Sequence, residues 1–202
     1  NPKARAFSSN RSRLLGLLVS DISNPFYAEL AKGIEKNAYE RGYNIIFCSE
    51  TAAKNEQDAL SFLLKSGVDG LIFASTKLRD KAARRIIKQG FPTVLVNRKL
   101  SGDDFNYVVC DNRKGAEQMM THLFAQGYDR IAIITGPSDL STGVDRLAGY
   151  YDSHKSRDLP VNADYTFQGP FDRETGYQGA NRFIEFEKRP HAIFAGNDYI
   201  AM

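Results

Sequence analysis

Apolar and polar positions along this chain alternate in a way that predicts strands and helices in turn. Residues 14–19 form a continuous apolar run, as expected of a parallel strand covered on both faces. Asn24 then suits a helix N-cap and Pro25 suits the first helical position. Apolar residues follow every four positions from Phe26 to Ala38, and a glycine at position 42 is placed to stop the helix. The pattern predicts a strand followed directly by an amphipathic helix.

The same alternation continues to the end of the chain. Further strands are expected at residues 44–49, 68–74, 92–96, 107–110, 131–134, 165–168 and 192–195, and further helices at 55–65, 79–89, 112–125, 142–156 and 173–187. Strands that alternate with helices predict parallel sheets with right-handed crossovers. Two successive series, joined near Asp111, predict an α/β fold with two lobes, each a parallel sheet with helices on both faces. We expect a segment at 1–12, a first lobe at 13–111 and a second lobe at 112–202.

Composition and charge change this picture only at the N-terminal end. A hydrophobic content of 42% and a charged content of 25% are ordinary for a globular chain, and no apolar run approaches the roughly 20 residues of a membrane span. The net charge is +3, yet Lys3, Arg5, Arg11 and Arg13 place four positive charges in the first thirteen residues. This basic segment is either a solvated terminus or a nucleic-acid contact.

Cysteine and histidine positions argue against a metal site. Cys48 and Cys110 each lie in an apolar run, which predicts buried, reduced thiols and favours the cytoplasm. The three histidines are scattered, so no metal-ligand spacing is present. We expect neither a metal ion nor a cofactor.

Candidate binding residues follow the predicted strands, because ligands of α/β sheets bind at the carboxyl ends of strands. These ends offer aromatic rings, amides, guanidiniums and one carboxylate: Phe26, Phe171, Asn24, Asn97, Asn197, Arg98, Arg146 and Asp198. Amides and forked guanidiniums bind pairs of hydroxyls, and rings cover the C–H face of a sugar. The mixture therefore favours a neutral sugar as ligand.

Each of these residues also has a simpler explanation. Asn24 and Asn197 suit helix caps, Phe26 suits the apolar stripe, and Arg146 has aspartates nearby in sequence. An enzyme is disfavoured, because the chain has no glycine-rich phosphate loop, no Gly-x-Ser-x-Gly elbow and no histidine at a strand end.

Several motifs are similar to those of one known family. They are residues 21–30 (DISNPFYAEL), 68–72 (VDGLI), 111–116 (DNRKGA), 146–150 (RLAGY), 176–177 (GY) and 192–198 (AIFAGND). In order and spacing they resemble the lactose/galactose repressor (LacI/GalR) family of bacterial transcription regulators, over essentially the whole chain. The resemblance implies a periplasmic-binding-protein-like core with an effector between its lobes, a homodimer, a helix-turn-helix domain before residue 1, and further chain after residue 202 that completes the second lobe.

The resemblance also assigns roles to individual residues. Positions that match sugar contacts of related ribose-binding receptors are Asn24, Phe26, Tyr27, Arg98, Arg146, Phe171 and Asn197. Asn97 departs from the family, since sugar-binding relatives commonly have Asp immediately before the arginine. Leu140 stands where the purine repressor has an arginine that helps to bind the base, which disfavours a purine effector.

Residues 4–12 resemble the family's hinge helix, which forms on operator DNA and inserts an apolar side chain into the minor groove. Phe7 takes that position here in place of the usual Leu, with Arg5 and Arg11 near phosphates. We therefore expect the effector-binding and dimerisation core of a cytoplasmic, sugar-responsive regulator that binds operator DNA. The alternative is an exported sugar receptor of a transporter, which shares the fold but lacks the basic hinge.

Overall fold

A computed structural model describes residues 11–50, 56–102 and 105–202. The chain divides into two compact units, Asn1–Val108 and Val109–Met202. Each unit is described by itself below. Arg5 and Phe7 of the expected hinge lie outside the described residues.

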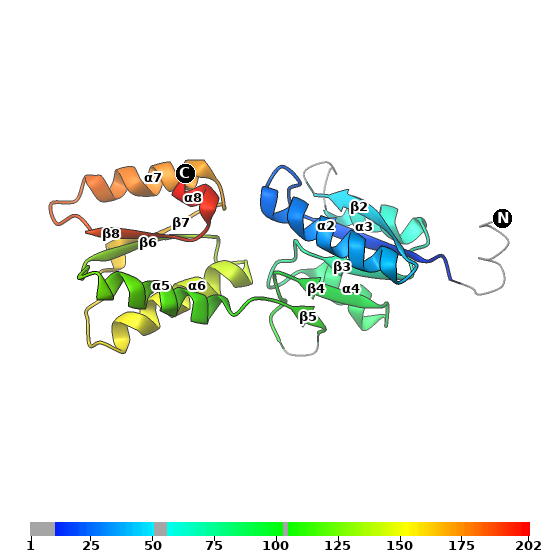
Figure 1. Ribbon diagram of the computed structural model, residues 1–202, viewed down its shortest axis with the longest axis horizontal. Helices are drawn as coiled ribbons and strands as arrows, with labels where there is room; N and C mark the ends of the chain where they lie inside the picture. Colours follow the sequence, from blue (N-terminus) through cyan, green and yellow to red (C-terminus); the bar gives the residue numbers. More distant parts are fainter. Residues whose placement is uncertain (1–10, 51–55, 103–104) are drawn as a thin grey trace. The chain divides into compact units, whose positions relative to one another are not determined.

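The first unit is a five-stranded parallel sheet with the strand order β2-β1-β3-β4-β5 (Figure 1). Its strands are β1 (Leu14–Val19), β2 (Asn44–Ser49), β3 (Gly70–Phe73), β4 (Thr93–Val96) and β5 (Tyr107–Val108). Its helices are α2 (Pro25–Glu40), α3 (Glu56–Lys65) and α4 (Lys81–Lys88). All strands run in the same direction, so their carboxyl ends share one edge of the sheet.

Helices cover both faces of this sheet, and the alternation of side chains along each strand explains why. Leu18 and Phe73 pack with α3 and α4 on one face, whereas Leu17 and Val19 pack with α2 on the other. The core stripe of α2 begins at Tyr27, which is 5% exposed, and not at Phe26, which is 50% exposed. The interpretation of Phe26 as part of the apolar stripe is therefore wrong, and this ring is available at the surface.

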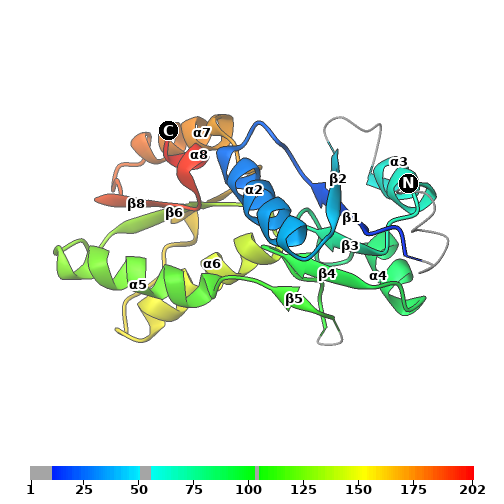
Figure 2. The ribbon, with the colours of Figure 1, turned by 45° about the vertical axis from the view of Figure 1, so that its right-hand side comes forward.

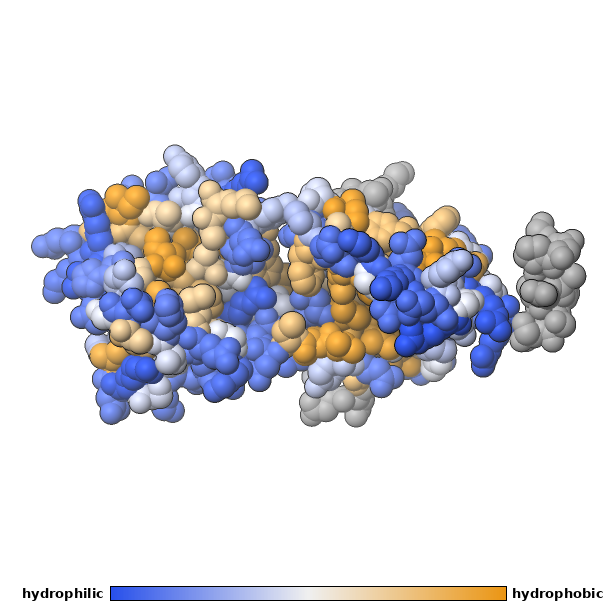
Figure 3. All heavy atoms as spheres, viewed as in Figure 1, coloured by the Kyte–Doolittle hydropathy of each residue, from blue (hydrophilic) through white to orange (hydrophobic). Residues whose placement is uncertain are grey.

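One part of the sheet is left uncovered by the described residues. Val94 on β4 and Tyr107 and Val108 on β5 are among the exposed large hydrophobic residues. Figure 3 shows apolar side chains gathered over the region of β3 to β5, whereas the outer face of α2 is hydrophilic. Helix α2 thus covers only part of its face of the sheet.

The second unit is built around a three-stranded parallel sheet with the order β7-β6-β8 (Figure 1). Figure 2 shows β6 and β8 with α7 on one side and α5 and α6 on the other. Its strands are β6 (Ile131–Thr135), β7 (Thr166–Gln168) and β8 (Ala192–Ala195), and a short 3-10 helix, η1 (Ala163–Tyr165), precedes β7. Its helices are α5 (Asn112–Ala125), α6 (Ser141–Lys155), α7 (Arg173–Ile184) and α8 (Asp198–Ala201). Ile131 and Ile133 pack with α5 and α6, while Ala132 and Ile134 pack with α7 and α8. The predicted fold class, parallel sheets with helices on both faces, is confirmed.

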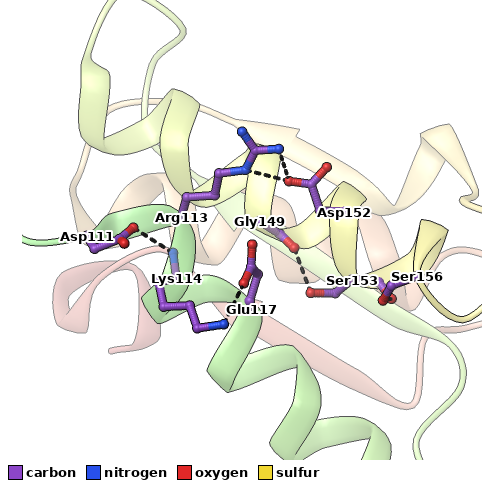
Figure 4. Close-up of polar contacts among 8 residues, drawn as sticks. All are labelled: Asp111, Arg113, Lys114, Glu117, Gly149, Asp152, Ser153 and Ser156. Atoms are coloured by element: carbon purple, nitrogen blue, oxygen red, sulfur yellow. Dashed lines mark hydrogen bonds and ion pairs between the residues drawn. The ribbon is translucent and has the colours of Figure 1, made fainter.

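Helices α5 and α6 approach each other closely at Gly149 (Figure 4). A Cβ atom there would lie 2.8 Å from the Cβ atom of Ala116 and would also collide with the carbonyl of Arg113. The guanidinium of Arg113 forms an ion pair with Asp152 across the two helices. The glycine on α6 permits this close crossing, and the ion pair adds a surface contact between the two helices.

Two expectations about side chains have different outcomes. Cys48 is half-buried, and burial raises the pKa of its thiol, but Cys110 is exposed, so the expectation of two buried thiols is wrong for Cys110. Cys110 follows the two-residue strand β5, which nothing among the described residues covers.

Within the described residues no helix is long and apolar enough to cross a membrane. In the same part of the chain, no three His, Cys, Asp or Glu side chains form a group able to hold a metal ion.

Candidate functional site

The loop from β1 to α2 brings Asn24 and Phe26 to the carboxyl edge of the first sheet. Asn24 is the N-cap of α2, and its side-chain oxygen accepts a 3.0 Å hydrogen bond from the main-chain N–H of Phe26. Asp21 holds the loop, because its carboxylate accepts hydrogen bonds from the main chain and hydroxyl of Ser23 at 2.9 and 2.7 Å. The amide oxygen of Asn24 therefore has a structural role, whereas the exposed ring of Phe26 lies at the edge.

Arg98 is the central group of this edge. It is 8% exposed, and its Nη1 donates to the hydroxyl of Ser20 at 3.2 Å and to the carbonyl of Ser75 at 3.1 Å. Its Nη2 donates to the hydroxyl of Tyr27 at 2.9 Å. Its Nε is buried and has no hydrogen-bond partner within the described ranges. The structure thus brings Tyr27 and Arg98 together at the carboxyl edge of the first sheet.

Asn97 has an unusual backbone conformation beside Arg98. Its φ is +67°, in the left-handed region, and its N–H donates to the carbonyl of Val108 at 2.9 Å. Asn is among the residues that adopt this conformation most readily, because its short polar side chain interacts with the local backbone. The backbone alone is a reason for Asn at this position, separate from any contact with a ligand.

Sequence reasoning missed a carboxylate at the same edge. Glu50 directly follows β2, and its N–H donates to the carbonyl of Val19 at 3.0 Å. Burial raises the pKa of the Glu50 carboxyl, and the positive charge of Arg98 acts in the opposite direction. Glu50 would have been found if the residue after this predicted strand had been included among the strand ends. Glu50 adds a carboxyl group to this edge that was not among the binding residues selected from the sequence.

The second unit places Arg146 at the carboxyl edge of its own sheet. Its Nε donates to the side-chain oxygen of Asn112 at 3.0 Å, and its Nη1 donates to the carbonyl of Gly196. The guanidinium carbon lies 5.8 Å from the centre of the Phe171 ring, which is within cation–π range. The structure therefore gathers Arg146 and Phe171 with Asn112, which the sequence analysis did not select as a binding residue.

A glycine makes room for the Phe171 ring. Gly136 follows β6, and a Cβ atom there would collide with the ring of Phe171. Thr135, the last residue of β6, is fully buried, and its hydroxyl has no hydrogen-bond partner in the part of the chain that the structure describes. Thr135 is the one polar residue at the end of an otherwise apolar strand, and this pattern in the sequence would have identified it as a candidate site residue.

Asn197 follows β8 and caps the short helix α8, where its side-chain oxygen accepts a 2.9 Å hydrogen bond from Ile200 N–H. Its position at the edge matches the expectation, but its oxygen is used within the protein. Leu140 is 7% exposed and stands at the N-cap of α6, where it makes no side-chain capping bond.

A polar groove lies elsewhere on the second unit. It has a volume of about 530 Å³ and is lined by α5 and the end of α6, including Lys114, Glu117 and Asp152 (Figure 4). Lys114 pairs with Glu117, and Asp152 pairs with Arg113, so the charges of the groove are largely matched among themselves. None of the predicted binding residues lines it.

Residues 12–202 match the family model described as periplasmic binding proteins and sugar binding domain of LacI family. The ribose operon repressor of Escherichia coli (strain K12) is 30% identical over 203 residues, which cover 98% of this chain and 61% of the repressor. The PurR repressor of Aliivibrio salmonicida (strain LFI1238) is 27% identical, covering 98% of this chain and 60% of PurR.

A solved structure adds a ligand to this comparison. The Cra transcriptional dual regulator from Pseudomonas putida, in complex with fructose 1-phosphate, is 26% identical with a TM-score of 0.81, covering 94% of this chain and 70% of Cra. The chain thus spans about three fifths of the length of the curated repressors that it matches.

Proposed function

We propose that this chain is the effector-binding part of a bacterial transcriptional regulator of the LacI family. The chain belongs to the family of periplasmic binding proteins and LacI-type sugar-binding domains. In this proposal it acts in the cytoplasm without catalysing a reaction. It binds a small-molecule effector, pairs with a second copy, and controls operator binding through a helix-turn-helix domain and the basic hinge.

One observation carries the binding role: each unit holds a guanidinium at the carboxyl edge of its sheet, next to an aromatic ring. Arg98 binds the hydroxyl of the buried Tyr27, whose ring packs edge to face against the exposed ring of Phe26 with 5.2 Å between the centroids. Arg146 lies against Phe171. Guanidiniums bind hydroxyl or phosphate oxygens through paired N–H groups, and aromatic rings cover the C–H face of a sugar. We propose that these groups bind the effector and that its binding changes how the regulator approaches DNA.

A sugar or phosphosugar is the effector class that these groups favour. Arg98 and Arg146 each offer positively charged N–H donors at the edge of a sheet, and such donors suit hydroxyl and phosphate oxygens. The fructose 1-phosphate bound to Cra and the name of the ribose operon repressor agree with this class.

A nucleobase is the competing effector class, since PurR is also among the relatives. Leu140 disfavours it, because a buried leucine side chain offers no hydrogen bond to a base. An exported sugar receptor is the competing protein class. The relatives named above are repressors and a transcriptional regulator, which supports the regulator.

Calorimetric titration of the full-length protein with monosaccharides, phosphosugars and purines tests the effector class. We expect a member of the first two groups to bind and the purines to give no heat. Arg182→Ala is the control for Arg146→Ala, because the Arg182 side chain is 45% exposed on α7, lies 3.8 Å from Asp164 and has its guanidinium carbon 6.0 Å from the centre of the Phe186 ring. Asn97→Asp should retain binding if the effector is a plain sugar. Tight purine binding without any response to sugars would refute the proposal.

A further inference from the structure

Asp69 binds the main chain at the start of β1. One carboxylate oxygen accepts hydrogen bonds from the N–H and the hydroxyl of Ser12 at 2.9 and 3.0 Å. The other accepts from the N–H of Arg13 at 2.8 Å. In return, the N–H of Asp69 donates to the carbonyl of Leu14 at 2.7 Å. Residues 12–14 and Asp69 are thus joined by hydrogen bonds in both directions.

Arg13 needs these contacts because its backbone is strained. Its φ is +57°, a left-handed conformation that is unfavourable for a residue with a long side chain. Its carbonyl accepts a 2.9 Å hydrogen bond from Asn44 N–H at the start of β2. The guanidinium lies over Gly42, where a Cβ atom would approach Nη1 to 2.9 Å. Contacts with two other segments therefore hold Arg13 in a turn immediately before β1.

A carboxylate is suited to this role. It presents two acceptor oxygens side by side, which match two consecutive main-chain N–H groups, and an amide presents only one acceptor and a donor. Burial raises the pKa of Asp69, but the hydrogen bonds from Ser12 and Arg13 outweigh it and hold the pKa below its ordinary value. The group is consequently ionised, and accepts three hydrogen bonds, at neutral pH.

We propose that Asp69 is the positioning residue that sets the point and direction at which the basic N-terminal segment joins the first unit. This inference rests on the proposed function, in which that segment contacts operator DNA. An attachment that is already held in one conformation needs no ordering when DNA binds, whereas a frayed attachment has to become ordered, and this cost weakens the complex. Asp69 lies before β3 and contacts no residue of the candidate binding edges in the bonds described above.

The experiment compares Asp69→Asn with the parent in the full-length protein. Asp69→Asn keeps the size of the side chain but removes one acceptor and the charge. Ser12→Ala is the milder companion, because it removes only the hydroxyl donor. Glu29→Gln is the matched control, since the Glu29 side chain is 76% exposed on α2 and forms a 3.8 Å surface pair with Lys32. Circular dichroism checks that each variant is folded.

The first readout does not depend on DNA. Trypsin can cut after Arg13 only if the turn at Ser12 and Arg13 and the start of β1 open, so mass spectrometry of the fragment that begins at Leu14 reports on the turn. We expect this fragment to form at least fivefold faster in Asp69→Asn, by a smaller factor in Ser12→Ala, and at the parent's rate in Glu29→Gln. Equal rates in Asp69→Asn and the parent would overturn the proposal.

The second readout is operator affinity, measured with effector affinity on the same samples. We expect Asp69→Asn to bind operator at least fivefold more weakly with unchanged effector affinity. Faster cleavage with unchanged operator affinity would overturn the positioning role. A parent that binds no operator DNA would overturn the proposed function and the operator role together, while the cleavage rates would still decide whether Asp69 holds the turn.

Discussion

Replacing Tyr27 by Phe tests how Arg98 is held at the edge of the first sheet. The substitution keeps a ring that is 5% exposed and removes the hydroxyl that accepts a 2.9 Å hydrogen bond from Arg98 Nη2. Hydrogen bonds to charged groups contribute about 1.5–3 kcal/mol, and an unsatisfied buried donor adds its desolvation cost. We expect the free energy of unfolding to fall by about 2 kcal/mol, because Arg98 is 8% exposed.

Urea unfolding followed by far-UV circular dichroism measures this change. With an m-value of about 1–3 kcal/mol per molar urea, the midpoint of the first unit should fall by roughly 1 M. Tyr39→Phe is the matched control, because Tyr39 lies on the same helix and is 75% exposed. Its effect should stay within about 0.5 kcal/mol.

A second background isolates the pair. Arg98→Met removes the guanidinium and keeps an apolar stem, so adding Tyr27→Phe to it should cost much less than Tyr27→Phe alone. If Tyr27→Phe unfolds like Tyr39→Phe, or costs the same with and without the guanidinium, the hydrogen bond between Tyr27 and Arg98 does not hold this edge.

Three further predictions concern the second unit and the N-terminal segment. Arg146→Ala should weaken effector binding by about 2 kcal/mol or more in calorimetry, because it removes a charge-assisted donor pair; unchanged affinity would make Arg146 purely structural. Gly149→Ala should lower the free energy of unfolding by about 1–3 kcal/mol, since α5 leaves no room for a Cβ atom, whereas Gly115→Ala has nothing within 4 Å and should be neutral or stabilising in the same urea titration. Phe7→Ala should reduce operator affinity and DNA bending without changing effector affinity, while Arg11→Ala should mainly lower the salt dependence; parent-like bending by Phe7→Ala would refute the hinge hypothesis.

Apolar runs and helix-capping residues correctly predicted the elements whose ends depend on residues close by in the chain. The strands at 14–19 and 44–49 and the helix start at Pro25 are observed where the apolar runs and the Asn-Pro pair placed them. The predicted ends of strands that depend on pairing with other strands were less accurate. The strand predicted at 68–74 is observed as Gly70–Phe73, although main-chain hydrogen bonds to β1 continue at Asp69 and Ala74. The predicted family and fold class are confirmed.

The candidate site was predicted as a set of positions, and their chemistry depends on tertiary contacts. Asn24 and Asn197 follow strands as expected, yet each uses its side-chain oxygen to cap a helix. The exposure of Phe26 and the left-handed backbone of Asn97 could not be read from a periodic pattern. Glu50 was missed although it follows a predicted strand. Binding by these residues stays a prediction.

The sequence by itself determined the order of strands and helices, the parallel direction of the strands and the edge at which polar groups collect. The elements follow from periodicity and capping residues, which act over a few residues, and the parallel direction follows from the general preference for right-handed crossovers between strands that alternate with helices. The tertiary structure alone decided which donors and acceptors are used within the protein. Arg98 meets Tyr27 across 71 positions and Asp69 meets Ser12 across 57. Such pairs depend on strand order and register, and no short window of sequence contains both partners.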